Sequence, residues 1–364
     1  MRDSPDPDAV LAWMRRDWNQ RALDDPERHV YSRDLATDET DFYRSGQVNY
    51  RQLLQPYLPI LLQGRSPREC CVVEIGCGLG RITRWLAEHF GRVAAVDISE
   101  EMIRGARERL ADCPNVEWFV GSGSDLAMLP DAAFDLAFSY IVFQHIPSRD
   151  VIRSYVRETA RVLRPGGFFK FQLHGDPSLA HTPDTWFGET FSLDQSREML
   201  ESSGFSLVGA DGVGTQYTVL TARRGPLFET DGLRPYLYPG EDWAREQLLE
   251  GWREWMGGSW RAVLAQSAAR LLFPAGERRR FFMGLYLRPD DPFPPLRLTL
   301  TLNDTPLGSV ILTTGADHDL EFDVPENLGR PGDEVLVKLT VDPPCDLDRG
   351  PAIRCLGIIA HPAA

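Results

Sequence analysis

The chain of 364 residues contains almost no lysine, since Lys170 and Lys338 are the only two and arginine supplies the remaining positive charge. It is short of positive charge as a whole, with a formal net charge of −14 at pH 7. Nucleic acids are bound through clustered lysine and arginine side chains, so this balance argues against nucleic acid as a partner. A local basic pocket for a small-molecule substrate stays compatible with it.

Long apolar runs are absent too. No stretch reaches the roughly 18 consecutive apolar residues that a membrane span requires, and residues 1–8 are acidic and proline-rich. The six cysteines, at positions 70, 71, 77, 113, 345 and 355, lack the paired close spacing of a zinc site. We therefore expect a cytoplasmic protein with reduced thiols, no bound metal and no membrane partner.

The residues that are present divide the chain into four segments. Residues 1–64 have a helical, aromatic pattern, and 65–224 alternate between short apolar runs and helical periodicity. Residues 225–262 form a linker with a tryptophan-rich helix, and 263–364 alternate with a period of two in many short stretches. The last pattern predicts a separate all-β sandwich of about 100 residues.

The N-terminal segment begins with a helix that Asp6 caps and Pro7 starts. Its aromatic side chains, from Trp13 to Tyr43, allow two interpretations. They cover the core of the next segment, or they form a lid that closes over an active site and excludes water.

Residues 65–224 predict an α/β fold. Strands are expected at 71–75, 93–96, 116–120, 134–139, 168–173, 205–208 and 216–221, with helices between the earlier ones. Strands separated by helices in this way form a parallel, doubly wound, Rossmann-like sheet, here of seven strands. Ligands of such sheets bind at the carboxyl ends of the strands.

The first of these strands runs into Gly76, Gly78 and Gly80 and then into a helix. Glycine has no Cβ and accepts positive φ, so such a turn brings bare backbone against a ligand. The dinucleotide fingerprint G-x-G-x-x-G requires glycine where this chain has Arg81, which argues against NAD. Glu74, two residues before the first glycine, would repel a pyrophosphate and favours a cation.

Four motifs in this order resemble those of the class I S-adenosylmethionine-dependent methyltransferases, over roughly residues 40–224: EIGCGLG (74–80), DIS (97–99), FDL (134–136) and RPGG (164–167). The resemblance implies S-adenosylmethionine as cofactor, with the glycine loop under its methionine moiety and Glu74 nearby. It further implies that Asp97 accepts hydrogen bonds from both ribose hydroxyls and that Ile98 and Met102 flank the adenine.

The chain departs from the family after the third strand, where an acidic residue is usual and Ser122 stands instead. The adenine contact is therefore carried over to Asp125, the first carboxylate that follows. Backbone amides of Gly123 and Ser124 are the alternative.

Methyl transfer from a sulfonium mainly requires in-line positioning and exclusion of water. A hydroxyl acceptor also needs a base, whereas a carboxylate needs none. The candidate bases are His174, which ends the fifth strand, and His145, which follows the fourth, because an imidazole titrates near pH ~6.5. For His145 the alternative is a role in helix packing.

The acceptor pocket is expected between the cofactor and nearby aromatic side chains. Tyr140 is expected to contact the cofactor there. Four further residues are expected to bind the substrate: Tyr43, Phe143, His181 and Trp186. For Trp186 the alternative is a place in the core.

The sequence thus predicts an S-adenosylmethionine-dependent methyltransferase acting on an oxygen or nitrogen of a small molecule, such as a sugar or natural-product intermediate. Two alternatives stay open: aminopropyl transfer or cyclisation with the same cofactor, and a non-catalytic protein that binds the cofactor and a partner. The layout resembles bacterial methyltransferases with appended carbohydrate-binding-like domains. The sandwich would recognise a sugar or acceptor, brace the core, or join two copies into a homo-oligomer.

Overall fold

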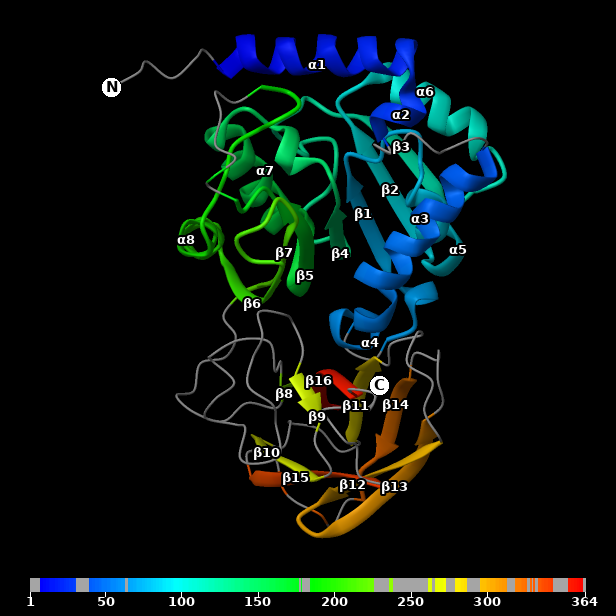
Figure 1. The fold of residues 1–364 in the computed structure, drawn as a ribbon, viewed down its shortest axis with the longest axis vertical. Coiled ribbons are helices and arrows are strands. Elements are labelled where there is room, and N and C mark those ends of the chain that lie inside the picture. The colour runs from blue at the N-terminus through cyan, green and yellow to red at the C-terminus, as the bar shows by residue number, and fades with distance from the viewer. Residues whose placement is uncertain are drawn as a thin grey trace. The chain divides into compact units, whose positions relative to one another are not determined.

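The computed structural model describes residues 7–30, 39–62, 65–176, 178, 184–225, 236–237, 261–263, 266–272, 279–286, 295–312, 318–325, 328, 330, 333–342 and 353–362. The chain divides into two compact units (Figure 1). The first covers 1–54, 65–207 and 211–227, and the second covers 55–64, 208–210 and 228–364. The tryptophan-rich helix expected within 225–262 lies outside the described residues, and the four expected segment boundaries stay predictions.

A seven-stranded sheet forms the centre of the first unit. Its strands are β1 (Cys71–Ile75), β2 (Arg92–Asp97), β3 (Val116–Val120), β4 (Phe134–Ser139), β5 (Leu163–Leu173), β6 (Phe205–Asp211) and β7 (Thr218–Arg224). The strand order is β3-β2-β1-β4-β5-β7-β6, and β1 lies parallel to both β2 and β4. The doubly wound Rossmann-like fold is confirmed.

The expectation of an all-parallel sheet is wrong at one strand, because β7 runs antiparallel to β5. Only residues 212–217 connect β6 to β7. A turn of that length can join antiparallel neighbours, whereas a parallel crossover needs a dozen or more residues. The strand β5 also begins at Leu163, five residues before the expected start at 168.

Helices flank the sheet where the apolar periodicity predicts them. They are α5 (Thr83–His89), α6 (Glu100–Arg109), α7 (Arg149–Val162) and α8 (Leu193–Ser202), and the 3-10 helix η3 (Phe143–His145) precedes α7. Ser99 caps α6 as expected, since its hydroxyl accepts a hydrogen bond from the Met102 amide. Ser192 forms a capping box with Gln195 at the start of α8.

The N-terminal segment folds into α1 (Pro7–Asp24), α2 (Pro26–Val30) and α3 (Glu39–Leu53), followed by η1 (Gln55–Tyr57), α4 (Leu58–Leu61) and η2 (Pro67–Glu69). The helix expected from Pro7 is confirmed. In Figure 1, α1 crosses the end of the sheet at which β1 and β2 finish. Hydrogen bonds fix it there, among them those from Arg15 to the Ser122 carbonyl after β3 and from Arg21 to the Thr185 carbonyl beyond β5.

The second unit contains two antiparallel sheets. One has the order β10-β15-β12-β13 and the other β14-β11-β16-β8, with β9 paired to β16. Their strands are β8 (Tyr236–Leu237), β9 (Arg261–Val263), β10 (Gln266–Leu272), β11 (Arg279–Tyr286), β12 (Leu296–Leu302), β13 (Thr305–Leu312), β14 (His318–Asp323), β15 (Glu334–Asp342) and β16 (Ile353–Pro362). The β-rich C-terminal region is confirmed, and its packing as a sandwich stays a prediction.

In the described part of the chain, no helix is both long and apolar enough to cross a membrane. The described residues also contain no group of three or more His, Cys, Asp or Glu side chains placed to hold a metal ion.

Candidate cofactor and acceptor site

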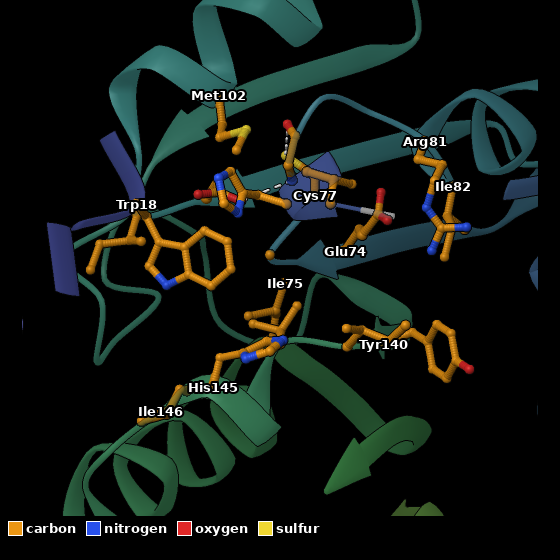
Figure 2. Close-up of a pocket in the computed structure, with 18 of the residues that line it drawn as sticks. Trp18, Glu74, Ile75, Cys77, Arg81, Ile82, Met102, Tyr140, His145 and Ile146 are labelled. Atoms are coloured by element: carbon orange, nitrogen blue, oxygen red, sulfur yellow. Dashed lines mark hydrogen bonds between the residues drawn. The ribbon is translucent and has the colours of Figure 1, made fainter. Parts of the chain in front are cut away.

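A pocket opens at the carboxyl end of the first unit's sheet (Figure 2). Five parts of the chain line it: β1 with the glycine loop and the following turn, the end of β2 with α6, the loop after β4, α7 through Tyr155, and the first two helices. From these parts come Glu74, Gly76, Cys77, Gly78, Arg81, Asp97, Ile98, Met102, Tyr140, Ile141, Val142, His145, Met14, Trp18, His29 and Val30, among others. The pocket therefore lies where a doubly wound sheet binds its ligands.

The glycine loop provides a cradle of bare backbone. Gly76 and Gly78 have φ angles of 76° and 52°, which disfavour residues with a Cβ. A Cβ on Gly76 would lie 2.2 Å from Val142 Cγ2, and one on Gly78 would lie 3.1 Å from Val30 Cγ2. Gly80 has a φ of 81° and lies outside the lining, with Leu110 Cδ1 2.6 Å from where a Cβ would stand, and its cofactor contact stays a prediction.

Asp97 is fixed at the edge of this cradle. Its carboxylate accepts hydrogen bonds from the Gly78 amide at 2.8 Å and from the Ser99 amide at 2.9 Å. Burial raises the pKa of Asp97, while the hydrogen bonds from backbone amides oppose that rise. An anchored carboxylate in contact with the glycine loop is a suitable acceptor for the hydroxyls of a bound ribose.

Glu74 and Arg81 bring an acidic and a basic side chain to one part of the pocket (Figure 2). Glu74 is 4% exposed, and it accepts a hydrogen bond from Thr83 Oγ1 at 2.5 Å. Burial raises the pKa of Glu74 to about 8, against the opposing effects of Thr83 and Arg81. Arg81 donates to Asn49 Oδ1 at 2.6 Å, so α3 holds its guanidinium in place. A ligand that carries both an ammonium and a carboxylate fits this pair.

The expected adenine contacts separate into two groups. Ile98 and Met102 line the pocket. Gly123 lies behind Ile98, whose Cδ1 would be 2.5 Å from a Cβ on the glycine. Ser124 and Asp125 are held by hydrogen bonds from their amides to Ser122 Oγ, and neither belongs to the lining. The cofactor contacts of Gly123, Ser124 and Asp125 stay predictions.

His145 lines the pocket with both ring nitrogens engaged. Its Nδ1 lies 2.8 Å from the Trp186 carbonyl oxygen and its Nε2 lies 3.0 Å from Gln144 Nε2. The side chain of Gln172 donates to Gln144 Oε1, so the Gln144 amide group must donate to His145. Burial lowers the pKa of His145 to about 4. A neutral imidazole bonded at both nitrogens favours the packing role of His145 over that of a base, and its catalytic role stays a prediction.

The low pKa of His145 makes the protein less stable in acid. The unfolded imidazole titrates near 6.5 and the folded one near 4, so the unfolded state binds more protons in between. The free energy of unfolding therefore decreases as the pH is lowered through this window. Urea unfolding at pH 7 and at pH 4.5 is expected to show that the wild type loses about 2 kcal/mol more than His145→Gln. Equal losses in the two proteins would contradict this description of His145.

The remaining predicted residues lie in different surroundings. His174 is 1% exposed and is not among the residues that line the pocket. Phe143, the first residue of η3, is fully buried in the core against Phe169 and Phe171. Tyr43 lies outside the lining and beneath the guanidinium of Arg84. The substrate and catalytic roles of these residues stay predictions, and His181 lies outside the described residues.

Tyr140 is part of the pocket lining, whereas Trp186 lies outside the lining and against its residue His145, and the predicted roles of both stay predictions. Tyr140 lines the pocket, and burial raises the pKa of its phenol. Trp186 is 37% exposed, and its ring contacts His145 at a centroid distance of 5.5 Å. Arg21 Cζ lies 4.6 Å from the Trp18 ring centre and 5.1 Å from that of Trp186. The ring of Trp18 from α1 and the ring of Trp186 from the loop after β5 thus flank the Arg21 guanidinium.

The first two helices contribute side chains that sequence reasoning did not identify individually. Met14, Trp18, His29 and Val30 all line the pocket, which favours the lid interpretation of this segment. The sequence offered only an aromatic stretch far from the glycine motif. It gave no signal for His29, whose Nδ1 is buried without a hydrogen-bond partner among the described residues. Burial lowers the pKa of His29, and the charge of Arg21 lowers it further.

Comparisons with known proteins show what the chain is similar to. Residues 73–171 match a family described as a methyltransferase domain. A trans-aconitate 2-methyltransferase of Azoarcus sp. is 39% identical over 124 residues, which are 32% of this chain and 46% of that protein. A probable S-adenosylmethionine-dependent methyltransferase of Mycolicibacterium smegmatis is 30% identical over 194 residues, 52% of this chain and 69% of that protein.

A solved structure is also similar, that of the 1,6-didemethyltoxoflavin-N1-methyltransferase of Burkholderia thailandensis. It is 23% identical, has a TM-score of 0.45, and the match covers 62% of this chain and 93% of that one. The chain spans about half the length of the first curated relatives that it matches.

Proposed function

Because the chain belongs to the S-adenosylmethionine-dependent methyltransferases, we propose that it transfers a methyl group from this cofactor to an oxygen or nitrogen of a small molecule. One observation supports the proposal above the others. Asp97 and Gly78, from the ends of different strands, are joined by a 2.8 Å hydrogen bond inside a single pocket. Bound S-adenosylmethionine supplies a methyl group on a positively charged sulfur, which leaves as a neutral thioether.

In this proposal the chain's own residues divide the pocket into three regions. Gly76 and Gly78 allow the ligand to approach the backbone, and Asp97 accepts hydrogen bonds from its ribose hydroxyls. Glu74 and Arg81 take the ammonium and the carboxylate of the methionine moiety. Ile98 and Met102 enclose the adenine with apolar surface, as their place in the lining allows.

The acceptor is proposed to bind on the side of Trp18, Tyr140 and His145. Exclusion of water there falls to α1, which contributes Met14 and Trp18 to the lining. The aromatic rings of Trp18 and Trp186, with Arg21 between them, suit a small polar ring compound such as a sugar or a natural-product intermediate.

Turnover by the full chain tests the proposal. The protein is incubated with methyl-labelled S-adenosylmethionine and a panel of sugars, hydroxy acids, phenols and amines, and the nucleoside products are quantified. Acceptor-dependent S-adenosylhomocysteine and a labelled product are expected, and Asp97→Ala serves as the inactive control. Release of methylthioadenosine would indicate aminopropyl transfer instead. Tight binding of the cofactor without any turnover would indicate a binding protein.

A further inference from the structure

His29 lies where the part of the pocket proposed for the cofactor meets the part proposed for the acceptor. It is the next-to-last residue of α2, and its neighbour Val30 lies over the glycine loop, 3.1 Å from where a Cβ of Gly78 would stand. On another side, the His29 ring meets the edge of Trp186 at a centroid distance of 6.1 Å. The imidazole therefore stands between the cofactor cradle and the wall proposed for the acceptor.

The ring nitrogen of His29 is available for a ligand. Its Nδ1 is buried and makes no hydrogen bond within the described part of the protein. A buried polar atom without a partner carries a desolvation cost that a ligand's donor would remove. Among the described histidines, only His29 both lines the pocket and has a buried ring nitrogen without a hydrogen bond to the described residues. His145 is bonded at both nitrogens, and His174 lies outside the lining.

Other titratable groups in the lining are poorly suited to accept a proton. The carboxylate of Asp97 already binds two backbone amides, and the carboxyl of Glu74, whose pKa burial raises to about 8, is mostly protonated near neutral pH and bonded to Thr83. Tyr140 and Tyr155 are phenols that burial keeps protonated. Near His29, the charges of Arg21 and Arg28 oppose protonation of its imidazole, while Asp24 and Asp25 favour it.

We infer that His29 is the catalytic base and that the acceptor is a protic nucleophile, a hydroxyl or an N–H group. His29 Nδ1 takes the acceptor's proton while the acceptor atom bonds to the methyl carbon and the carbon–sulfur bonding pair passes to sulfur. The imidazolium then releases its proton to water. The inference rests on the proposed function and assigns a role that sequence reasoning had given to His145 or His174.

Two cofactor analogues test this without a known acceptor. S-adenosylhomocysteine lacks the transferred methyl, and sinefungin carries an amino group on carbon at that place. Calorimetry gives the ratio of their affinities for the full-length wild type, His29→Phe and His29→Asn. Because a hydrogen bond to a charged group is lost, His29→Phe is expected to reduce the preference for sinefungin about 10-fold. Asn, whose side-chain oxygen lies near the position of Nδ1, is expected to retain part of it.

His89→Phe is the matched control, because the Nδ1 of His89 is bonded to the Trp85 carbonyl outside the pocket lining. Its ratio of affinities is expected to equal that of the wild type. The inference is overturned if His29→Phe binds S-adenosylhomocysteine normally with an unchanged ratio. If the wild type binds neither analogue, the proposed function itself fails.

Discussion

Gly78→Val is expected to abolish binding of S-adenosylhomocysteine while the protein stays folded. Gly78 has a φ of 52°, where a β-branched residue is strained, and a Cβ there would lie 3.1 Å from Val30 Cγ2. Both residues line the pocket, so the valine side chain fills space that the ligand needs. Backbone strain of this kind costs on the order of 1–3 kcal/mol, less than the roughly 5–15 kcal/mol that stabilise a typical domain.

The measurement is a calorimetric titration with S-adenosylhomocysteine, and circular dichroism checks that the variant is folded. Gly204→Val is the matched control. Gly204 also has a positive φ, 84°, but a Cβ there meets no atom within 4 Å. It should lose stability and keep its affinity. Normal affinity in Gly78→Val would remove the glycine loop from the proposed cofactor site.

Asp97→Asn is expected to weaken cofactor binding by about 1–3 kcal/mol, or roughly 5- to 150-fold. The two carboxylate oxygens accept from the Gly78 and Ser99 amides. An asparagine has one oxygen, so its NH2 group must face one of these donors, and the ribose loses a charged acceptor. The effect therefore combines a weaker ligand contact with a disturbed loop.

Titration of Asp97→Asn with S-adenosylhomocysteine gives the size of this effect. Asp112→Asn provides the comparison, because Asp112 is an exposed partner of Arg84 in an ion pair outside this pocket. Its affinity is expected to match that of the wild type. An affinity of Asp97→Asn within twofold of the wild type would contradict a ribose contact.

Much of the first unit's fold follows from local sequence signals. The glycines at 76, 78 and 80, the cap at Ser99 and the apolar runs of the strands all act within a few residues. Strand direction does not follow from such local signals, so the sequence did not indicate that β7 runs antiparallel to β5. It depends on how the short turn at 212–217 folds back, and on pairing with β5, about fifty residues earlier in the chain.

The candidate site likewise has one part that local sequence signals indicate and another part that depends on tertiary packing. The part proposed for the cofactor consists of consecutive residues around Gly78 and of Asp97, all of which lie in the sequence motifs. The part proposed for the acceptor brings together Trp18 and His29 of the lining and Trp186 beside His29, which are distant in sequence. A histidine at the end of a strand attracts attention in a sequence, as His174 did, but burial decides whether it meets the pocket. Only packing of the N-terminal helices brings His29 there.

The most direct test of the central claim is a crystal structure of the full chain with S-adenosylhomocysteine. The account predicts the ligand in the pocket of the first unit, its ribose hydroxyls within hydrogen-bond distance of the Asp97 carboxylate and its methionine moiety beside Gly76 and Glu74. A ligand bound elsewhere, or a ribose that does not reach Asp97, would contradict it.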